Sequence, residues 1–184
     1  MIRGCWIRFL IVVGLKLSVV VPDAHVRAED GDSSDVHLFL SPFCGICQQR
    51  FVEAVRDFPS LENWGGRLEF HLVALRGDSR EFLMLQHLVC ANAQGRFIPY
   101  FLFVSRATAE GRGIQHDQLV STLGLNVEAF HQCVRDSART DAVLERSRAI
   151  FDTFVFRGVP SVIVKDKAFT FRDMGEVLDV YSSE

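Results

Sequence analysis

The pair Cys44 and Cys47 lies where an apolar run gives way to a helical pattern, and this junction constrains the fold more than any other feature. The run "VHLFLS" (36–41) is typical of a short buried strand, and from Cys47 onward apolar residues recur at helical spacing until Pro59. Free N–H groups and the dipole at a helix N-terminus stabilise a thiolate. The pattern therefore predicts an exposed nucleophile at Cys44 and a sheltered resolving thiol at Cys47.

Two other uses of a C-x-x-C pair fit the sequence less well. A structural zinc site needs about four ligands, but the chain has a single C-x-x-C, and its histidines at 37, 71, 87, 116 and 131 show no H-x₃₋₅-H spacing. A disulfide that closes so short a loop restricts the unfolded chain little. We therefore expect no metal ligands and a redox role for the pair.

The order of strand and helix patterns predicts an α/β fold. The expected strands are 36–41, 68–75, 158–164 and 168–171. The expected helices, besides the one opened by Cys44, are 80–98 (ended or kinked by Pro99), 115–123, 127–137 (capped by Asn126), about 141–156 (capped by Thr140 or Asp141) and about 173–181. Without its helical middle, about 78–153, this order is the β-α-β and β-β-α layout of a minimal thioredoxin fold.

Pro160 stands at the start of the β-branched run "GVPSVIV" (158–164). A proline inside a central strand would remove a hydrogen bond from the ladder, so one interpretation is an edge strand. The other interpretation is a cis Val159–Pro160 bond beside the cysteines, which leaves backbone groups free to pair with a substrate peptide.

The first 28 residues have the pattern of an export signal. Arg3 and Arg8 precede a short apolar run, 9–21, and Val26 and Ala28 are small residues at the positions that a signal peptidase recognises. We expect cleavage after Ala28 and export to the periplasm or an equivalent compartment, with an uncleaved anchor as the alternative.

Charge and cysteine content limit the possible partners and bonds. The chain of 184 residues has a formal net charge of -3 and no basic stripe, which argues against nucleic acid as a partner. Cleavage would leave the cysteines at 44, 47, 90 and 133. An even number in an exported chain suggests two disulfides, and four cysteines allow three connectivities.

Four segments occur in the order found in one protein family. They are "FCGIC" (43–47), "CANAQGRF" (90–97), "LGLNVEAFHQC" (123–133) and "RGVPSVIV" (157–164). With these segments the sequence resembles the DsbA-like thiol:disulfide oxidoreductases over most of 36–184. The resemblance implies a thioredoxin-like fold, with a mixed central sheet and an all-helical insertion, within residues 29–184, and it implies no cofactor.

The resemblance also implies residue roles. Cys44 and Cys47 form the redox disulfide, with Cys44 as the nucleophile, while Phe43, Val159 and Pro160 contact the substrate. Cys90 and Cys133 correspond to the second, structural disulfide of some family members; two separate buried thiols are the alternative.

Two positions depart from the pattern of the strongest oxidants in the family. Those proteins carry Pro-His between the cysteines, where this chain has Gly45 and Ile46. Ile46 cannot stabilise a thiolate, which predicts a less oxidising pair. Leu38 occupies the position of a buried acid in many thioredoxin-fold proteins, and His37 beside it is expected to be a surface or structural residue.

The function implied by these features is disulfide exchange with cysteine-containing exported proteins, with the chain acting as a monomeric disulfide-forming oxidase. A membrane protein of the DsbB or VKOR type would reoxidise it. Two alternatives stay open here: a reductase or isomerase served by a DsbD-type reductant, and a non-catalytic thioredoxin-like binding or metal-handling module.

Overall fold

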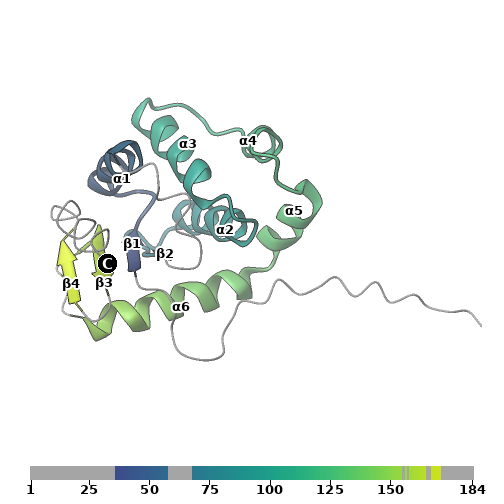
Figure 1. Cartoon of the computed structure of the whole chain (residues 1–184). Coiled ribbons are helices and arrows are strands. Elements are labelled where there is room, and N and C mark those ends of the chain that lie inside the picture. Colours follow the sequence, from purple (N-terminus) through teal and green to yellow (C-terminus); the bar gives the residue numbers. More distant parts are fainter. Residues whose placement is uncertain (1–35, 58–67, 155, 157, 165–166, 171–184) are drawn as a thin grey trace, which may run out of the picture. The chain divides into compact units, whose positions relative to one another are not determined.

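A four-stranded mixed sheet, in the order β2-β1-β3-β4, forms the centre of the fold (Figure 1). The strands are β1 (Val36–Leu40), β2 (Leu68–Leu72), β3 (Ser161–Val164) and β4 (Lys167–Thr170). β1 pairs in parallel with β2 and antiparallel with β3, which in turn pairs antiparallel with β4. This mixed sheet confirms the expected α/β fold class.

The structure is a computed structural model, and it describes residues 36–57, 68–154, 156, 158–164 and 167–170. The expected export signal (1–28), the helix-ending Pro59 and the C-terminal helix (173–181) lie outside these residues. Within the described part of the chain, no helix is long and apolar enough to cross a membrane.

β1 is buried on both faces because helices cover both sides of the sheet. Leu38 and Leu40 join a core cluster with Phe51 of α1 (Gly45–Asp57). Phe39 points to the opposite face, where its ring lies 5.5 Å from that of Phe151 in α6 (Ser137–Thr153). Figure 1 shows α1 above the strands and α6 running below them. The two faces of the sheet therefore hold separate sets of side chains.

Five helices lie between β2 and β3. They are α2 (Ser79–Ala93), α3 (Phe97–Ala109), α4 (His116–Thr122), α5 (Val127–Arg135) and α6. The expected cap of α5 is confirmed, because the Asn126 side chain accepts a hydrogen bond of 3.0 Å from the Ala129 N–H. These helices supply the all-helical part of the expected fold.

The single helix expected over 80–98 is wrong, since a break separates α2 from α3. Gly95 adopts a φ of 67°, a conformation that glycine reaches without steric cost. The Arg96 N–H then donates to the Ala91 carbonyl at 2.8 Å, which closes α2. Pro99 lies in the first turn of α3, where its missing N–H removes no helical hydrogen bond.

The start of α6 also differs from the expectation. The helix begins at Ser137, and its cap is Asp136, whose side chain accepts from the Arg139 N–H at 3.3 Å. Thr140, one of the two expected caps, is a fully buried residue inside the helix. The connection from α5 to α6 is shorter than the sequence suggested, because Asp136 also ends α5.

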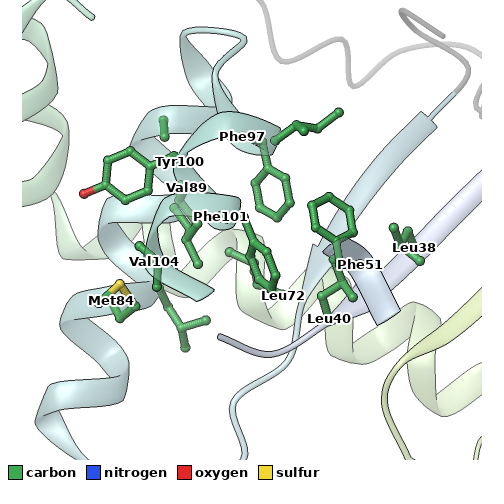
Figure 2. Close-up of a cluster of buried hydrophobic side chains, with 14 of the residues drawn as sticks. Leu38, Leu40, Phe51, Leu72, Met84, Val89, Phe97, Tyr100, Phe101 and Val104 are labelled. Atoms are coloured by element: carbon green, nitrogen blue, oxygen red, sulfur yellow. The ribbon is translucent and has the colours of Figure 1, made fainter. Parts of the chain in front are cut away.

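The apolar segment 96–104 contributes to the core of the insertion. Tyr100, Phe101 and Val104 of α3 are completely or almost completely buried. Phe101 also contacts Phe51 edge to face at 4.9 Å between ring centroids. Figure 2 shows Phe51 between the aromatic side chains of α3 and the leucines of β1. Helix α1, which begins next to Cys44, is therefore fixed by packing on the insertion as well as on the sheet.

Candidate active site around Cys44 and Cys47

Cys44 occupies the junction between β1 and α1. Its carbonyl accepts the first helical hydrogen bond, from the Gln48 N–H at 3.0 Å, and its own N–H donates to the Ser41 carbonyl at 3.2 Å. The Cys47 N–H donates to Cys44 Sγ at 3.1 Å. A side-chain acceptor at this place receives both a backbone hydrogen bond and the positive end of the helix dipole. Negative charge on Cys44 Sγ is therefore stabilised by α1.

Cys47 is one turn further along α1 and is completely buried in the core. Burial raises the pKa of its thiol well above the usual value, and the neighbouring Cys44 thiol raises it further. Cys44, in contrast, is partly exposed. The pair thus consists of one accessible sulfur and one sheltered, protonated thiol.

The loop before β3 brings Val159 and Pro160 next to the cysteines. The Val159–Pro160 peptide bond is cis, and the Val159 carbonyl oxygen is 3.7 Å from Cys44 Sγ. Gly158 has a φ of 149°, which a side chain would rarely permit. The Ser161 hydroxyl donates to the Gly158 carbonyl at 2.5 Å and closes this loop. The Val159 carbonyl therefore lies beside the Cys44 sulfur.

Phe43, immediately before Cys44, is half-buried and lies under a cation. The guanidinium of Arg76 is 4.7 Å from the centroid of the Phe43 ring, a distance typical of a cation–π contact. A cleft of about 380 Å³ opens beside Phe43, with Arg80, Leu83 and Ile114 among its walls. Phe43, the residue before Cys44, therefore has both a cation and an apolar cleft beside it.

Glu81, which sequence reasoning missed, holds the loop that carries Arg76. Its completely buried carboxylate accepts hydrogen bonds from the N–H groups of Leu75, Arg76 and Gly77 at 2.8, 2.6 and 2.8 Å. The signal available in the sequence was the spacing Asp78-x-x-Glu81, which is typical of a helix start. Asp78 indeed accepts from the Glu81 N–H at 2.8 Å. Glu81 thus positions Arg76 from inside the protein.

Gln48 and Ser41 support the loop in front of Cys44. Gln48 of α1 is buried, and its side-chain amide donates to the Pro42 carbonyl at 2.6 Å. The Ser41 hydroxyl accepts from the Phe43 N–H at 3.4 Å. These contacts fix the path of the chain on which Cys44 stands.

Cys90 and Cys133 are joined by a disulfide between α2 and α5. The bond lies within the helical insertion and does not involve Cys44 or Cys47, which are both free thiols. The four cysteines in the described part of the chain therefore form two separate pairs.

His37 and His71, which are far apart in the sequence, meet on the face of the sheet that α6 covers. His37 Nδ1 and His71 Nε2 are 2.9 Å apart, and Glu69 lies beside both. His37 is 5% exposed, so it is a buried residue and not a surface one. Burial, helped by the charge of His37 and of Arg146, lowers the pKa of His71 to about 3. His71 is therefore neutral near pH 7.

Comparison with known proteins gives structural but not sequence matches. The sequence matches no protein-family model and no curated protein. Among solved structures, the chain is similar to DsbA from Proteus mirabilis in complex with a non-covalently bound peptide, with a TM-score of 0.62 and 14% identity over 84% of this chain and 92% of that one.

Two further solved structures show the same similarity. One is the thiol-disulfide exchange protein alpha-DsbA2 from Wolbachia pipientis, with a TM-score of 0.57 and 16% identity over 83% of this chain and 84% of that one. The other is the cytosolic disulfide reductase DsbM from Pseudomonas aeruginosa, with a TM-score of 0.56 and 17% identity over 78% of this chain and 93% of that one. The chain therefore has the DsbA-like thioredoxin fold, with a helical insertion between β2 and β3.

Proposed function

We propose that this chain is a thiol:disulfide oxidoreductase that exchanges disulfides with cysteine-containing proteins. The observation that carries the proposal is the surrounding of Cys44 Sγ. The sulfur is partly exposed, receives the Cys47 N–H at 3.1 Å and lies 3.7 Å from the Val159 carbonyl. A stabilised thiolate, a buried partner thiol and an adjacent backbone for peptide pairing are the requirements of this chemistry.

The exchange starts from the oxidised Cys44–Cys47 disulfide. A substrate thiolate attacks Cys44 Sγ, because only this sulfur is accessible, and the bond between the two cysteine sulfurs breaks. Cys47 leaves as a thiolate and takes up a proton, which its raised pKa favours. A second substrate thiolate then attacks the substrate sulfur of the mixed disulfide and releases Cys44. The substrate loses two electrons to the pair and gains a disulfide.

Phe43, Val159 and Pro160 are the proposed substrate-contacting residues. The cis bond at Pro160 leaves the backbone of Val159 beside Cys44, where an extended peptide can pair with it. The cleft next to Phe43 offers apolar surface for a side chain of the same peptide. The peptide bound to the similar DsbA of Proteus mirabilis supports a peptide or protein substrate.

A trapping experiment tests this assignment. In the Cys47→Ser variant the resolving thiol is missing, so the Cys44 thiolate should attack a peptide whose cysteine carries a thionitrobenzoate disulfide, release thionitrobenzoate, and stay joined to the peptide in a mixed disulfide visible by mass spectrometry. Cys44→Ser is the matched control and should form no adduct. An adduct on Cys47 of the Cys44→Ser variant, with none on Cys44 of the other, would overturn the order of attack.

For the direction of electron flow, the proposal is a disulfide-forming oxidase, reoxidised by a membrane protein of the DsbB or VKOR type. A reductase or isomerase served by a DsbD-type reductant is the second candidate, favoured by one observation. Ile46 is 65% exposed, and its side chain has no polar atom that could donate to Cys44 Sγ. A reduction potential of the pair near about -120 mV supports the oxidase, and one near about -270 mV the reductase.

Export with cleavage after Ala28, and a monomeric state, are part of the same proposal. The sequence pattern of residues 1–28 supports export, and the disulfide between Cys90 and Cys133 fits an oxidising compartment. The mass of the protein purified from an envelope fraction gives its N-terminus. A chain that begins at Glu29 agrees with the proposal, and an intact N-terminus in the cytosol contradicts it.

A further inference from the structure

Three side chains that can ligate a metal meet on the sheet face that α6 covers. His37 of β1 pairs with Glu69 of β2 in the parallel ladder. His71 follows Glu69 by two positions, so it points to the same face of the sheet. The three ligand atoms lie within 4.8 Å of one another. The register of two neighbouring strands thus produces a cluster that the sequence spacing does not reveal.

The distances within this cluster match those of a small metal site. His37 Nδ1 is 2.9 Å from His71 Nε2, and Glu69 Oε2 is 3.6 Å from the former and 3.8 Å from the latter. In a tetrahedral zinc site with bonds of about 2.0–2.1 Å, ligand atoms are about 3.3–3.4 Å apart. Shifts of about half an ångström would therefore give three ligands at bonding distance and leave a fourth position open.

The surroundings resemble the outer shell of a metal site. The ring of His71 stacks on Phe39, with centroids 4.5 Å apart, which fixes its orientation. Arg146 of α6 is 3.2 Å from Glu69 Oε1 and donates to Glu69 Oε2 at 3.3 Å, so its guanidinium holds both oxygens of the carboxylate. Carboxylates that bind metals are commonly held in this way. The positive guanidinium also weakens binding of a cation, so we expect micromolar affinity.

Burial distinguishes this cluster from a chance group of surface side chains. The two histidines are 5% and 1% exposed, while the side chain of Glu69 is 25% exposed and gives the ion a way in. In the metal-free protein one imidazole N–H donates to the other ring across the 2.9 Å contact. On binding, that ring moves its proton to its other nitrogen, and both facing nitrogens offer a lone pair.

We propose that His37, Glu69 and His71 bind one divalent transition-metal ion, for which Zn²⁺ is the reference. Two imidazoles and a carboxylate are the ligands of zinc sites that keep one position open. The same ligand set also binds other divalent transition metals, so it does not select zinc alone. The proposal departs from the expectation of no metal ligands. The metal site does not depend on the proposed redox function, because the two lie on opposite faces of the sheet. Helix α1, which carries Cys47, packs on the face of Leu38 and Leu40.

The test uses the full chain with Cys44→Ser and Cys47→Ser, so that the two thiols cannot bind the metal. Titration calorimetry with Zn²⁺ should then show one ion per chain with a micromolar dissociation constant. Co²⁺ should give the intense visible absorption of a four-coordinate site with nitrogen and oxygen ligands. No binding of either ion in the micromolar range would overturn the proposal.

Variants of the ligands localise the ion. In the same background, Glu69→Gln and His71→Gln should each weaken Zn²⁺ binding by at least about tenfold. Glu69 is partly exposed, so Glu69→Gln keeps the test valid if the buried His71→Gln variant does not fold. His131→Gln, at a partly exposed histidine paired with Asp117, is the matched control and should bind as before. Unchanged affinity in a folded Glu69→Gln or His71→Gln variant would contradict the site.

Discussion

The backbone N–H of Cys47 donates to the Sγ atom of Cys44 across 3.1 Å. This contact serves both the proposed nucleophile, Cys44, and the proposed resolving thiol, Cys47. It stabilises charge on the accessible sulfur, and it holds the buried thiol one turn away, within reach of that sulfur. The reactivity of the pair should then depend on what else surrounds Cys44 Sγ.

The residue between the cysteines should tune the reduction potential. Ile46 is exposed and donates no hydrogen bond, so Ile46→His adds a donor near Cys44 without disturbing the core. Because it stabilises the thiolate of the reduced form, the potential should become more positive by about 30 mV or more. Equilibration with glutathione measures this. Val52→His, at an exposed position further along α1, is the control and should leave the reduction potential unchanged. A shift in Ile46→His that is negative, or no larger than the shift in Val52→His, would contradict the role of the residue between the cysteines.

Glu81 should be essential for stability although it touches neither cysteine. Glu81→Gln replaces one carboxylate oxygen by an NH₂ group that cannot accept, so either the Leu75 N–H or the N–H groups of Arg76 and Gly77 lose their acceptor. Loss of such buried charge-assisted hydrogen bonds should lower the free energy of unfolding by about 2–4 kcal/mol in urea. Glu128→Gln, an exposed acid in the first turn of α5, should cost less than about 1 kcal/mol. Similar losses in both variants would show that Glu81 is not an anchor.

The Cys90–Cys133 disulfide should support stability and not exchange. The bond spans 43 residues of sequence, and closing a loop of that size stabilises by about 4 kcal/mol in the chain-entropy description. The double variant Cys90→Ser and Cys133→Ser should unfold at a lower urea concentration but keep its exchange activity when folded. A folded double variant without activity would mean that this pair takes part in the chemistry.

The stacked rings of His87 and His116 should make the fold sensitive to acid. The rings are 4.0 Å apart, and the Tyr100 hydroxyl contacts His116 Nδ1 at 2.7 Å. Burial, with the charge of His87, lowers the pKa of His116 to about 4 in spite of the opposing charge of Asp117. The unfolded chain keeps a histidine pKa of about 6.5 and so binds more protons between these values. The free energy of unfolding should therefore fall as the pH decreases from about 6.5 to about 4.

The variant His116→Gln isolates this contribution. Because Gln does not titrate, the loss of stability over that pH range should be smaller than in the unchanged protein, by on the order of 2 kcal/mol after allowance for partial exposure of the ring. Urea unfolding at a series of pH values measures both slopes. Equal slopes for the two proteins would contradict the proposed role of His116.

Local patterns predicted the parts of the fold and site that depend on neighbouring residues. The junction at Cys44 and the cap at Asn126 each follow from a few adjacent side chains, and the structure agrees with both. The break at Gly95 is not visible in the sequence, because Gln94 and Arg96 also suit the solvent side of a helix. The helical pattern of 80–98 therefore continues across them. A glycine acts as a helix cap only where the following residues leave the helix, and the sequence alone does not show that.

Contacts between distant segments could not be predicted in this way. The meeting of His37, Glu69 and His71 depends on the register of β1 and β2, which a one-residue slip would abolish. Glu81 has the sequence context of an exposed helix start, and its burial follows from the path of the preceding loop. Both clusters are products of tertiary packing.

The central claim is that Cys44 carries out thiol–disulfide exchange. The most direct measurement compares the unchanged protein with its Cys44→Ser variant in the reduction of insulin by dithiothreitol and in the oxidation of a dithiol peptide. Activity of the unchanged protein in at least one assay, lost in the folded variant, is the predicted result. Activity that survives Cys44→Ser, or an unchanged protein inactive in both assays, would contradict it and favour a non-catalytic binding module.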